Sequence, residues 1–590
     1  MLFNREVLSV KKKSKSTSDM SLWDHPYENL DRALRAVVAR MTAGVSPHSA
    51  GEAWNDWALH LARSPGRQLE LLERAQRNAA KVAACWMRAG VLGPDDAPFS
   101  AKPHDHRFTD ETWQNAPFRM WQQGFLATQD WWDAATEKMS GEVGQDADRT
   151  RFQARQMLDL IAPSNFPWTN PEIIATTTKC GGANLIDGAV HFTQDLMQTL
   201  TQTHKPPPDG YLVGTDIACT PGDVVFRNDL FELIQYSPRT AKVHPEPILF
   251  IPAWIMKYYI LDLSPHNSMI NYLVGQGFTV FMISWCNPTA EHAEWSLEDY
   301  RKDGVLAALD VINTIVPNRK VHANGYCLGG TMLAITAATM AREGDDRFAS
   351  ITLMAAQVDF AEAGELLLFV DESQVAFVED LMWSQGYLDR PQMTRTFASI
   401  RSEDLIYTRA VRRYFLGRED LPTDIGVWNG DTTRMPARMH SEYLRGLFLE
   451  NRLSAGRFAV EGRVIALKDI STAMFVVGTE TDHIAPWQSV YKTRLFTDGD
   501  LTFVLTNKGH NGGIISEPGH VGRHYRMDRR ESGALYVGPD RWCDQNAPIT
   551  GSWWPALATW LAKQSSAKAS PPSAKTPPLC AAPGTYVHQV

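Results

Sequence analysis

Apolar side chains recur at a helical spacing through the first third of the chain. Between residues 53 and 77, and again between residues 120 and 132, Trp, Leu, Phe and Ala return every three or four positions, which is the repeat of an amphipathic helix. A Pro-, Asp- and His-rich stretch at residues 93–110 separates the two patterns, and a turn-rich segment at residues 164–171 follows them. This pattern predicts a mainly helical N-terminal domain over residues 21–210.

The spacing changes at about residue 246, where short apolar runs begin to alternate with helical patterns. Predicted helices separate four predicted strands, at residues 248–251, 278–284, 321–326 and 351–355. This alternation favours a largely parallel sheet with helices on both faces.

The alternation stops at about residue 360, and strand patterns return at residues 474–477 and 502–505. The intervening residues, about 360–460, are mostly helical in pattern and rich in aromatic side chains. An insertion of this kind between core strands is typical of a cap over an active site. We therefore expect a catalytic domain over residues 211–563 that carries a cap at about 360–460.

Both ends of the chain differ in composition from these domains. Residues 1–20 are basic and residues 564–590 are rich in Pro, Ala, Ser and Lys, so both segments are predicted to be disordered. Recognisable structure begins only at residue 21, which makes Met20 an alternative start. The first ten residues lack the apolar stretch of a signal peptide, and no run of about 18 apolar residues predicts a membrane span.

Composition narrows the class of protein. The chain has 590 residues, of which 44% are hydrophobic and 21% charged, as is typical of a globular enzyme with more than one domain. Its net charge of −9 argues against a nucleic-acid partner. The seven cysteines form no CxxC pair and show no zinc-like spacing, so we expect a reducing compartment and no disulfide framework.

The segment GYCLGG at residues 325–330 joins a predicted strand to a predicted helix. A sharp glycine-flanked turn in this context is the mark of a nucleophile elbow, here with Cys327 in place of the usual Ser. Gly325, Gly329 and Gly330 leave room for the turn, because a Cβ there would clash. The helix N-terminus behind the sulfur favours the thiolate, so the segment predicts an enzyme that carries an acyl group on Cys327.

Two later segments supply the other groups that acyl transfer needs. Asp482 and His510 each follow a predicted strand, in the chain order nucleophile, acid, His of the α/β-hydrolase fold. We assign Cys327 as nucleophile, His510 as base and Asp482 as the carboxylate that orients it. The predicted oxyanion hole uses the backbone N–H of Leu328 and a second N–H from the loop around Ala253-Trp254. The predicted fold is thus an α/β-hydrolase with a helical cap, preceded by an α-helical domain.

Each assignment has a competitor. Glu480 is close enough in sequence to replace Asp482, and Asp482 itself is suited to cap the following helix. His483 is a second candidate base, although its position beside the acid makes it face another way on extended backbone. His322 is expected to pack under the sheet and His440 to be a structural residue of the cap. A cysteine in an apolar turn is, moreover, often buried and inert.

Sulfur also changes the chemistry of the intermediate. A thioester on Cys327 keeps the acyl group activated, so its exchange with a CoA thioester is nearly neutral and its later transfer to a hydroxyl is downhill. This favours a synthase that uses acyl-CoA over a plain esterase.

Several motifs together make the chain resemble the polyhydroxyalkanoate synthases, the enzymes that make bacterial polyesters. The GYCLGG box is similar to the signature of that family, and the resemblance runs from about residue 50 to residue 563. It is carried further by GTD at residues 214–216, KYYILDL at residues 257–263, Trp428-Asn429 with the following DTTRMP and His440, Asp482-His483, and Gly509-His510.

The resemblance implies an activity and its partners. Tyr326 and Leu328, on either side of the cysteine, resemble the residues found there in class I members of the family. Class I is the single-subunit type that favours short substrates. An acyltransferase is thereby implied that polymerises an (R)-3-hydroxybutyryl-CoA-like substrate, releases CoA and uses no metal or redox cofactor. A homodimer at the surface of cytoplasmic polymer granules is implied as well.

Four positions differ from the usual family pattern. Ala253 and Met256 stand where Pro and Asn are expected, Cys286 where Arg is usual, and Asn511 where Ile is more common. Two other functions stay open at this point: a thiol esterase or depolymerase of the same fold, and a non-catalytic granule-associated paralogue.

Overall fold

The computed structural model describes residues 27–42, 44–87, 97–102, 104–201, 206–573 and 577–590. The predicted basic lead-in at residues 1–20, Met20 included, lies outside the described residues. Within the described parts of the chain, no helix has the length and apolar character needed to cross a membrane.

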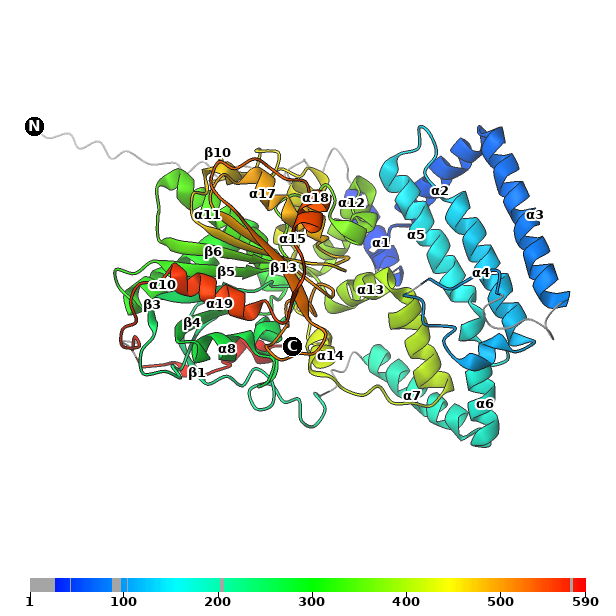
Figure 1. Ribbon diagram of the computed structural model, residues 1–590, viewed down its shortest axis with the longest axis horizontal. Helices are drawn as coiled ribbons and strands as arrows, with labels where there is room; N and C mark the ends of the chain where they lie inside the picture. Colours follow the sequence, from blue (N-terminus) through cyan, green and yellow to red (C-terminus); the bar gives the residue numbers. More distant parts are fainter. Residues whose placement is uncertain (1–26, 43, 88–96, 103, 202–205, 574–576) are drawn as a thin grey trace, which may run out of the picture.

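An eleven-stranded sheet forms the centre of the catalytic domain (Figure 1). Six central strands run parallel in the order β4-β3-β5-β6-β11-β12. Their bounds are β3 (His244–Ile251), β4 (Phe278–Trp285), β5 (Val321–Tyr326), β6 (Phe348–Met354), β11 (Met474–Thr479) and β12 (Leu501–Thr506). The predicted parallel sheet is therefore confirmed.

Antiparallel strands extend the sheet at both edges. Beyond β4 lie β2 (Phe231–Tyr236), β1 (Gly222–Arg227) and β15 (Cys580–Ala581). Beyond β12 lie β13 (His524–Arg530) and β14 (Ile549–Thr550).

Side chains on the central strands alternate between two apolar layers. Leu249 and Ile251 of β3 join the layer that contains α10 (Ala307–Ile315) and α11 (Leu328–Glu343). Ile248 and Phe250 join the opposite layer, which contains α8 (Met269–Gly275) and α19 (Trp554–Lys563). Because successive strand residues point to opposite faces, a strand covered on both sides reads as a continuous apolar run.

The segment between β6 and β11 is mainly helical. It contains α12 (Glu372–Gln385), α13 (Arg390–Ile400), α14 (Asp424–Gly430) and α15 (Ala437–Tyr443), with π-helical turns at Glu403–Thr408, Val411–Phe415 and Leu444–Leu449. It lies between the sheet and the N-terminal helices (Figure 1), and we call it the cap.

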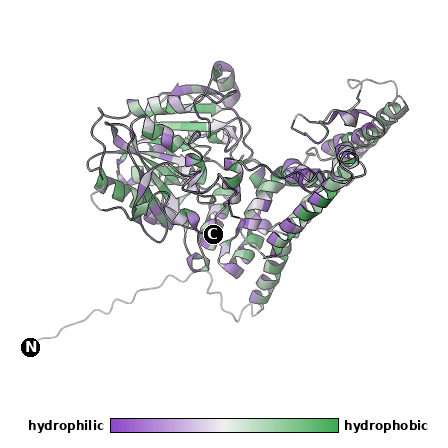
Figure 2. Ribbon diagram, turned by 90° about the horizontal axis from the view of Figure 1, so that it is seen from below, coloured by the Kyte–Doolittle hydropathy of each residue, from purple (hydrophilic) through white to green (hydrophobic). Residues whose placement is uncertain are grey.

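The N-terminal domain is built from helices, as predicted. They are α1 (Glu28–Met41), α2 (Pro47–Ala62), α3 (Pro65–Met87), α4 (Phe118–Ala135), α5 (Gly144–Ile161), α6 (Pro171–Lys179) and α7 (Ala183–Thr201). Trp57, Trp131 and Trp132 pack together between α2, α3 and α4, so the aromatic repeat seen in the sequence forms part of this domain's core. Figure 2 shows these helices projecting from one side of the catalytic body.

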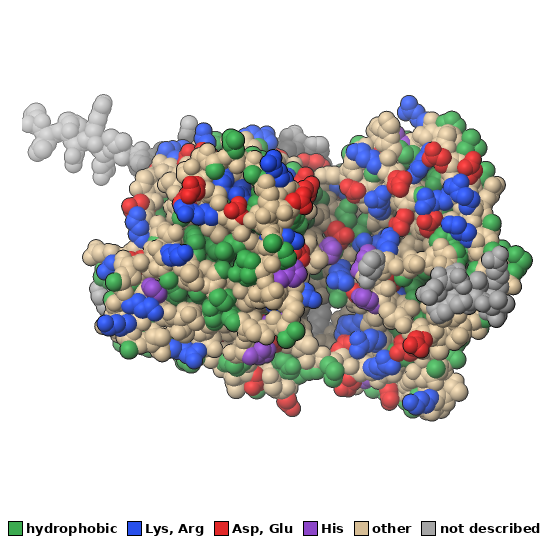
Figure 3. Space-filling view, in the orientation of Figure 1, with side chains coloured by type: hydrophobic (Ala, Val, Ile, Leu, Met, Phe, Trp, Pro, Cys, Tyr) green, Lys and Arg blue, Asp and Glu red, His purple; other side chains and the backbone are tan. Residues whose placement is uncertain are grey.

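Ion pairs and hydrogen bonds connect the N-terminal domain to the cap. Asp380 of α12 pairs with Arg32 and Arg35 of α1. Arg149 of α5 donates to the carbonyl oxygens of Leu368 and Val370, at 3.2 and 2.9 Å. Along this junction the surface is hollowed (Figure 3).

A second set of contacts reaches the far end of the cap. Asp195 of α7 pairs with Arg413 at 2.6 Å and accepts a hydrogen bond from the Tyr414 hydroxyl at 2.9 Å. Asn184 donates to the carbonyl oxygen of Phe415 at 2.7 Å. The cap is thus held from both ends by helices that precede the catalytic domain.

The prediction of a disordered C-terminal tail is wrong for residues 577–590. Strand β15 pairs with β1, and Val587 is only 2% exposed. The fully buried carboxylate of Glu232 accepts hydrogen bonds from the backbone N–H groups of Thr585 and Tyr586, at 2.8 and 2.9 Å. Composition failed here because the tail uses few apolar residues and orders instead through a sheet edge and a buried charge.

The same tail reaches the loop that follows β3. Lys257 Nζ donates to the carbonyl oxygens of Tyr586 and Gln589, at 3.2 and 2.7 Å. Burial lowers the pKa of Lys257 to about 8. Upstream, Ala569 forms an antiparallel bridge with Val243, the residue before β3. The part of the tail around Ala569 is therefore also bonded to the chain that enters the sheet.

Candidate active site

Cys327 occupies a strained turn between β5 and α11. Its backbone angles are φ 51° and ψ −124°, a region that residues other than Gly rarely adopt. The turn is held by hydrogen bonds from Cys327 N–H to Met354 O, at 2.9 Å, and from Gly330 N–H to Cys327 O, at 2.9 Å. This is the geometry that the sequence predicts for an elbow.

The three glycines of the elbow are needed for space. A Cβ on Gly325 would lie 2.4 Å from the Cα of Gly330, and one on Gly329 would lie 2.0 Å from the carbonyl oxygen of Ile251. A Cβ on Gly330 would lie 2.4 Å from the Cβ of Ala356. None of the three has a positive φ, so close approach of the backbone, rather than an unusual conformation, requires glycine here.

His510 and Asp482 meet at the carboxyl ends of the parallel strands. His510 Nδ1 lies 2.8 Å from Asp482 Oδ2, and the two side chains are 10% and 0% exposed. Burial opposes a charge on the imidazole, but Asp482 and Cys327 raise the pKa of His510 well above its ordinary value. Burial likewise opposes the charge on Asp482, yet His510 holds the pKa of that carboxyl below its usual range.

The Asp482 carboxylate is fully enclosed by hydrogen-bond donors. Thr479 Oγ1 donates to Oδ2 at 2.8 Å, and the backbone N–H groups of Ile484 and Ala485 donate to Oδ1, both at 2.8 Å. Asp482 therefore caps a turn and contacts His510 at once, so the two interpretations of this residue are compatible. Sequence reasoning missed Thr479, although its position at the end of a strand three residues before Asp482 is a usable signal.

The competing residues lie elsewhere. Glu480 faces His524, with 3.4 Å between Oε1 and Nε2, and the His483 side chain is exposed. His322 is buried between the hydroxyls of Ser350 and Ser565, and burial lowers its pKa to about 4.

The oxyanion loop predicted at Ala253-Trp254 lies against the elbow. A Cβ on Gly329 would lie 2.0 Å from Ile251 O and 2.7 Å from the carbonyl carbon of Pro252. The beginning of this loop therefore lies directly beside the start of α11. Leu328 is the first residue of that helix, where backbone N–H groups have no partner within the helix. Trp254 is buried against Tyr300, so the loop is firmly packed.

The cap approaches the sulfur through Tyr443 of α15. Burial and the nearby Cys327 raise the pKa of this phenol well above its ordinary value. Tyr443 also packs against Phe360 and Phe448, which gives this side of the site an aromatic wall. His440, one turn earlier and expected to be structural, is buried, and burial lowers its pKa to about 4.

The four positions that depart from the family pattern all lie within the catalytic domain. Met256 forms a β-bridge with Thr432 of the cap. Cys286 is buried, and burial raises its pKa to about 12. Asn511 accepts a hydrogen bond from the Tyr326 hydroxyl at 2.6 Å.

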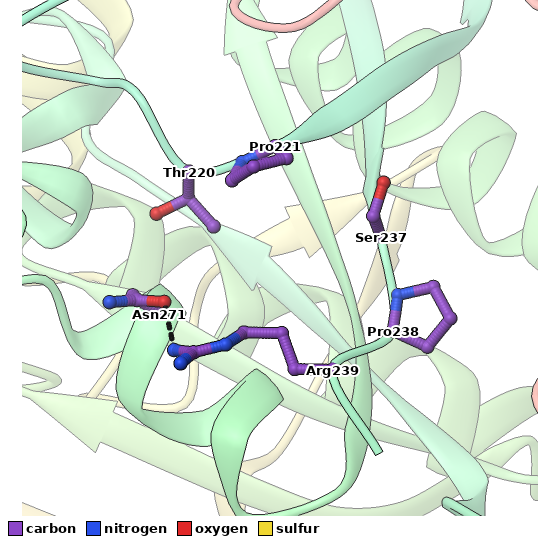
Figure 4. Close-up of a pocket in the computed structure, with 6 residues that line it drawn as sticks. All are labelled: Thr220, Pro221, Ser237, Pro238, Arg239 and Asn271. Carbon is purple, nitrogen blue, oxygen red and sulfur yellow. Dashed lines mark hydrogen bonds between the residues drawn. The ribbon is translucent and has the colours of Figure 1, made fainter. Parts of the chain in front are cut away.

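A hollow at the opposite end of the parallel strands lies away from this chemistry. It has a volume of about 410 Å³ and lies where β1 begins and β2 ends, at the amino ends of the parallel strands (Figure 4). It is lined by Thr220, Pro221, Ser237, Pro238, Arg239 and Asn271. Cys327 lies at the carboxyl ends, where α/β folds bind their ligands. Among the described residues, no three His, Cys, Asp or Glu side chains gather as a metal site requires.

Comparison with known proteins decides the family. The chain is 38% identical to the poly(3-hydroxyalkanoate) polymerase of Methylorubrum extorquens over 528 residues, which cover 88% of this chain and 86% of that protein. It is 35% identical to the poly(3-hydroxyalkanoate) polymerase subunit PhaC of Rhizobium meliloti (strain 1021) over 95% of this chain and 93% of that protein. The chain belongs to the poly(3-hydroxyalkanoate) polymerase family.

Family models agree with this assignment. The model described as poly-beta-hydroxybutyrate polymerase (PhaC) N-terminus matches residues 104–273, and a model of the N-terminal part of the same polymerases matches residues 25–67. The α/β-hydrolase fold matches residues 246–516, which confirms the predicted fold class. A solved structure, the monoacylglycerol lipase of Paleococcus ferrophilus, is 12% identical with a TM-score of 0.31, covering 57% of this chain and 99% of that chain.

Proposed function

We propose that this chain polymerises (R)-3-hydroxyacyl-CoA into polyhydroxyalkanoate through a covalent acyl-Cys327 intermediate. One observation carries the proposal: a cysteine on a strained elbow interacts with a histidine that is bonded to a buried carboxylate, within a poly(3-hydroxyalkanoate) polymerase chain. Nucleophile, base and orienting acid have the relations that acyl transfer needs.

Acylation is the first step. His510 accepts the proton of the Cys327 thiol, and the thiolate attacks the carbonyl carbon of the CoA thioester. The negative charge that develops on the oxygen is stabilised by backbone N–H groups of Leu328 and the loop around Ala253-Trp254. The C–S bond to CoA then breaks, and CoA leaves as a thiol with the proton from His510.

Chain growth is the second step. The 3-hydroxyl of another acyl unit gives its proton to His510 while its oxygen attacks a thioester carbonyl. An ester bond forms, the C–S bond breaks, and the sulfur leaves as a thiolate that recovers the proton. Asp482 stabilises the imidazolium in both steps. The aromatic wall that includes Tyr443 supports the exclusion of water, which would otherwise hydrolyse the intermediate.

The finer features of the proposal rest on residue resemblance. Tyr326 and Leu328 favour a short substrate such as (R)-3-hydroxybutyryl-CoA. The reaction as proposed needs no metal or redox cofactor, because the leaving group arrives on the substrate. We further propose that the enzyme works as a homodimer at the surface of cytoplasmic polymer granules.

Purified protein mixed with (R)-3-hydroxybutyryl-CoA tests the proposal. We expect thiol release together with turbidity from insoluble polymer, and loss of both in Cys327→Ala. Release of CoA with only free hydroxy acid as product would identify a thioesterase instead. Asp482→Ala is expected to slow both acylation and chain growth; wild-type rates in this variant would contradict the assignment of Asp482.

A further inference from the structure

A hydrogen bond connects the two segments that carry the proposed nucleophile and base. Tyr326 immediately precedes Cys327, and Asn511 immediately follows His510. The Tyr326 hydroxyl donates to Asn511 Oδ1 at 2.6 Å, although the two residues are far apart in the chain. Tyr326 is the last residue of β5, and Asn511 lies in the loop that follows β12.

The Tyr326 ring also packs against the imidazole. The ring centroids of Tyr326 and His510 are 5.6 Å apart, with 37° between the ring planes. Tyr326 is only 3% exposed, so its ring cannot leave this position without repacking the core. Burial and the neighbouring Cys327 raise the pKa of the phenol well above its ordinary value, so the hydroxyl keeps its proton and stays a donor.

Asn511 is equally well fixed. Its backbone carbonyl oxygen accepts hydrogen bonds from the backbone N–H groups of Ile514 and Ile515, at 3.1 and 3.0 Å. The backbone that carries His510 is therefore tied down on its C-terminal side by a closed turn, and that turn is tied to the elbow by the Tyr326 hydroxyl.

A second restraint on the imidazole is mechanistically useful. Asp482 fixes Nδ1, but a single hydrogen bond leaves the ring free to pivot about that contact. A displacement of about 1 Å at a reacting group can cost on the order of 100-fold in rate. Contact with the Tyr326 ring and the fixed backbone of Asn511, the residue next to His510, restrict that pivot.

We infer that Tyr326 and Asn511 act as a positioning pair, which holds the imidazole of the proposed base against the proposed nucleophile. The inference rests on the proposed acyl transfer. It also accounts for one departure from the family pattern: Ile at position 511 offers no acceptor, and the buried Tyr326 hydroxyl would be left without a partner.

The pair makes an asymmetric prediction for substitution. Asn511→Leu leaves the buried Tyr326 hydroxyl without an acceptor, whereas Tyr326→Phe leaves the half-buried Asn511 amide, which water can reach. We expect kcat for CoA release to fall about 10-fold in Asn511→Leu and about 3-fold in Tyr326→Phe, with KM unchanged. The double variant is expected to recover most of the loss of Asn511→Leu, because neither polar group is then left unpaired.

Alkylation of Cys327 by iodoacetamide separates positioning from stability. The rate, followed by mass spectrometry of the Cys327 peptide across the pH range, reports how well His510 supports the thiolate. We expect Asn511→Leu to slow alkylation about 10-fold at neutral pH and to shift the pH profile, with partial recovery in the double variant. Wild-type rates and profiles in both single variants, or strictly additive losses in the double variant, would overturn the inference.

Two features keep this test decisive. Tyr326→Phe retains the buried ring, so it reports on the pair even if Asn511→Leu does not fold. The alkylation profile needs no substrate. A wild-type protein that fails to polymerise hydroxyacyl-CoA would therefore refute the proposed function, whereas the profile would still decide the role of Tyr326 and Asn511.

Discussion

Thr479 offers the sharpest single test of the site. Its hydroxyl donates to Asp482 Oδ2 at 2.8 Å, the same oxygen that lies 2.8 Å from His510 Nδ1, and Thr479 is fully buried. Its methyl group packs against the next turn of the site, where a Cβ added to Gly513 would lie 2.4 Å from Thr479 Cγ2. Thr479→Val keeps this shape and removes only the hydrogen bond.

The expected magnitude follows from the charge of the acceptor. A hydrogen bond to an ionised group contributes about 1.5–3 kcal/mol, so the free energy of unfolding should fall by roughly 2 kcal/mol at neutral pH. The pKa of Asp482 lies below its ordinary value in the folded state. Its contribution to stability is therefore present above the ordinary Asp pKa and is lost as pH falls through the folded pKa. Thr479→Val removes one of the hydrogen bonds that lower the pKa of Asp482, so the folded pKa rises and much of that contribution is lost.

Urea denaturation and CoA release measure the two consequences. We expect a lower unfolding midpoint with an unchanged m-value, and about 10-fold slower CoA release because the carboxylate no longer holds His510 as firmly. Thr479→Ser keeps the hydroxyl and serves as the matched control. Wild-type stability and rate in Thr479→Val would refute the view that this hydroxyl supports the carboxylate.

Three further predictions address the elbow, the core and the tail. Gly329→Ala forces a methyl group to within 2.0 Å of Ile251 O, so we expect no soluble folded protein, whereas a folded variant with normal circular dichroism would contradict the crowding argument. His322 has a pKa of about 4 when folded, so the protein should lose about 3 kcal/mol of stability as pH falls from the ordinary His value towards 4, and His322→Asn should lack that part of the urea-midpoint slope. Deleting residues 577–590 removes two backbone hydrogen bonds to Glu232 and should lower the free energy of unfolding by about 3 kcal/mol or more; an unchanged thermal midpoint would show that the tail only rests on the sheet.

Local sequence patterns determined the architecture of the catalytic domain and the identity of the candidate site. The apolar run of β3 predicts a strand covered on both faces because strand side chains alternate with a period of two. Glycines at positions 325, 329 and 330 predict the elbow because the chain must approach itself there more closely than a Cβ allows. Asp482 and His510 could be named because parallel strands bring their carboxyl ends to one edge.

Tertiary structure alone decided which partners those residues meet. The position of Thr479 at a strand end, three residues before Asp482, makes it a candidate partner, but only the structure shows that its hydroxyl faces the carboxylate. Nothing near Tyr326 in the chain reveals Asn511 as its acceptor. The tail shows the same limit most clearly, because composition describes a segment in isolation, whereas its order comes from the β1 edge and the buried Glu232. Periodicity and turn chemistry are properties of neighbouring residues and can be read along the chain. Hydrogen bonds between distant segments depend on how the elements pack, which those local properties leave open.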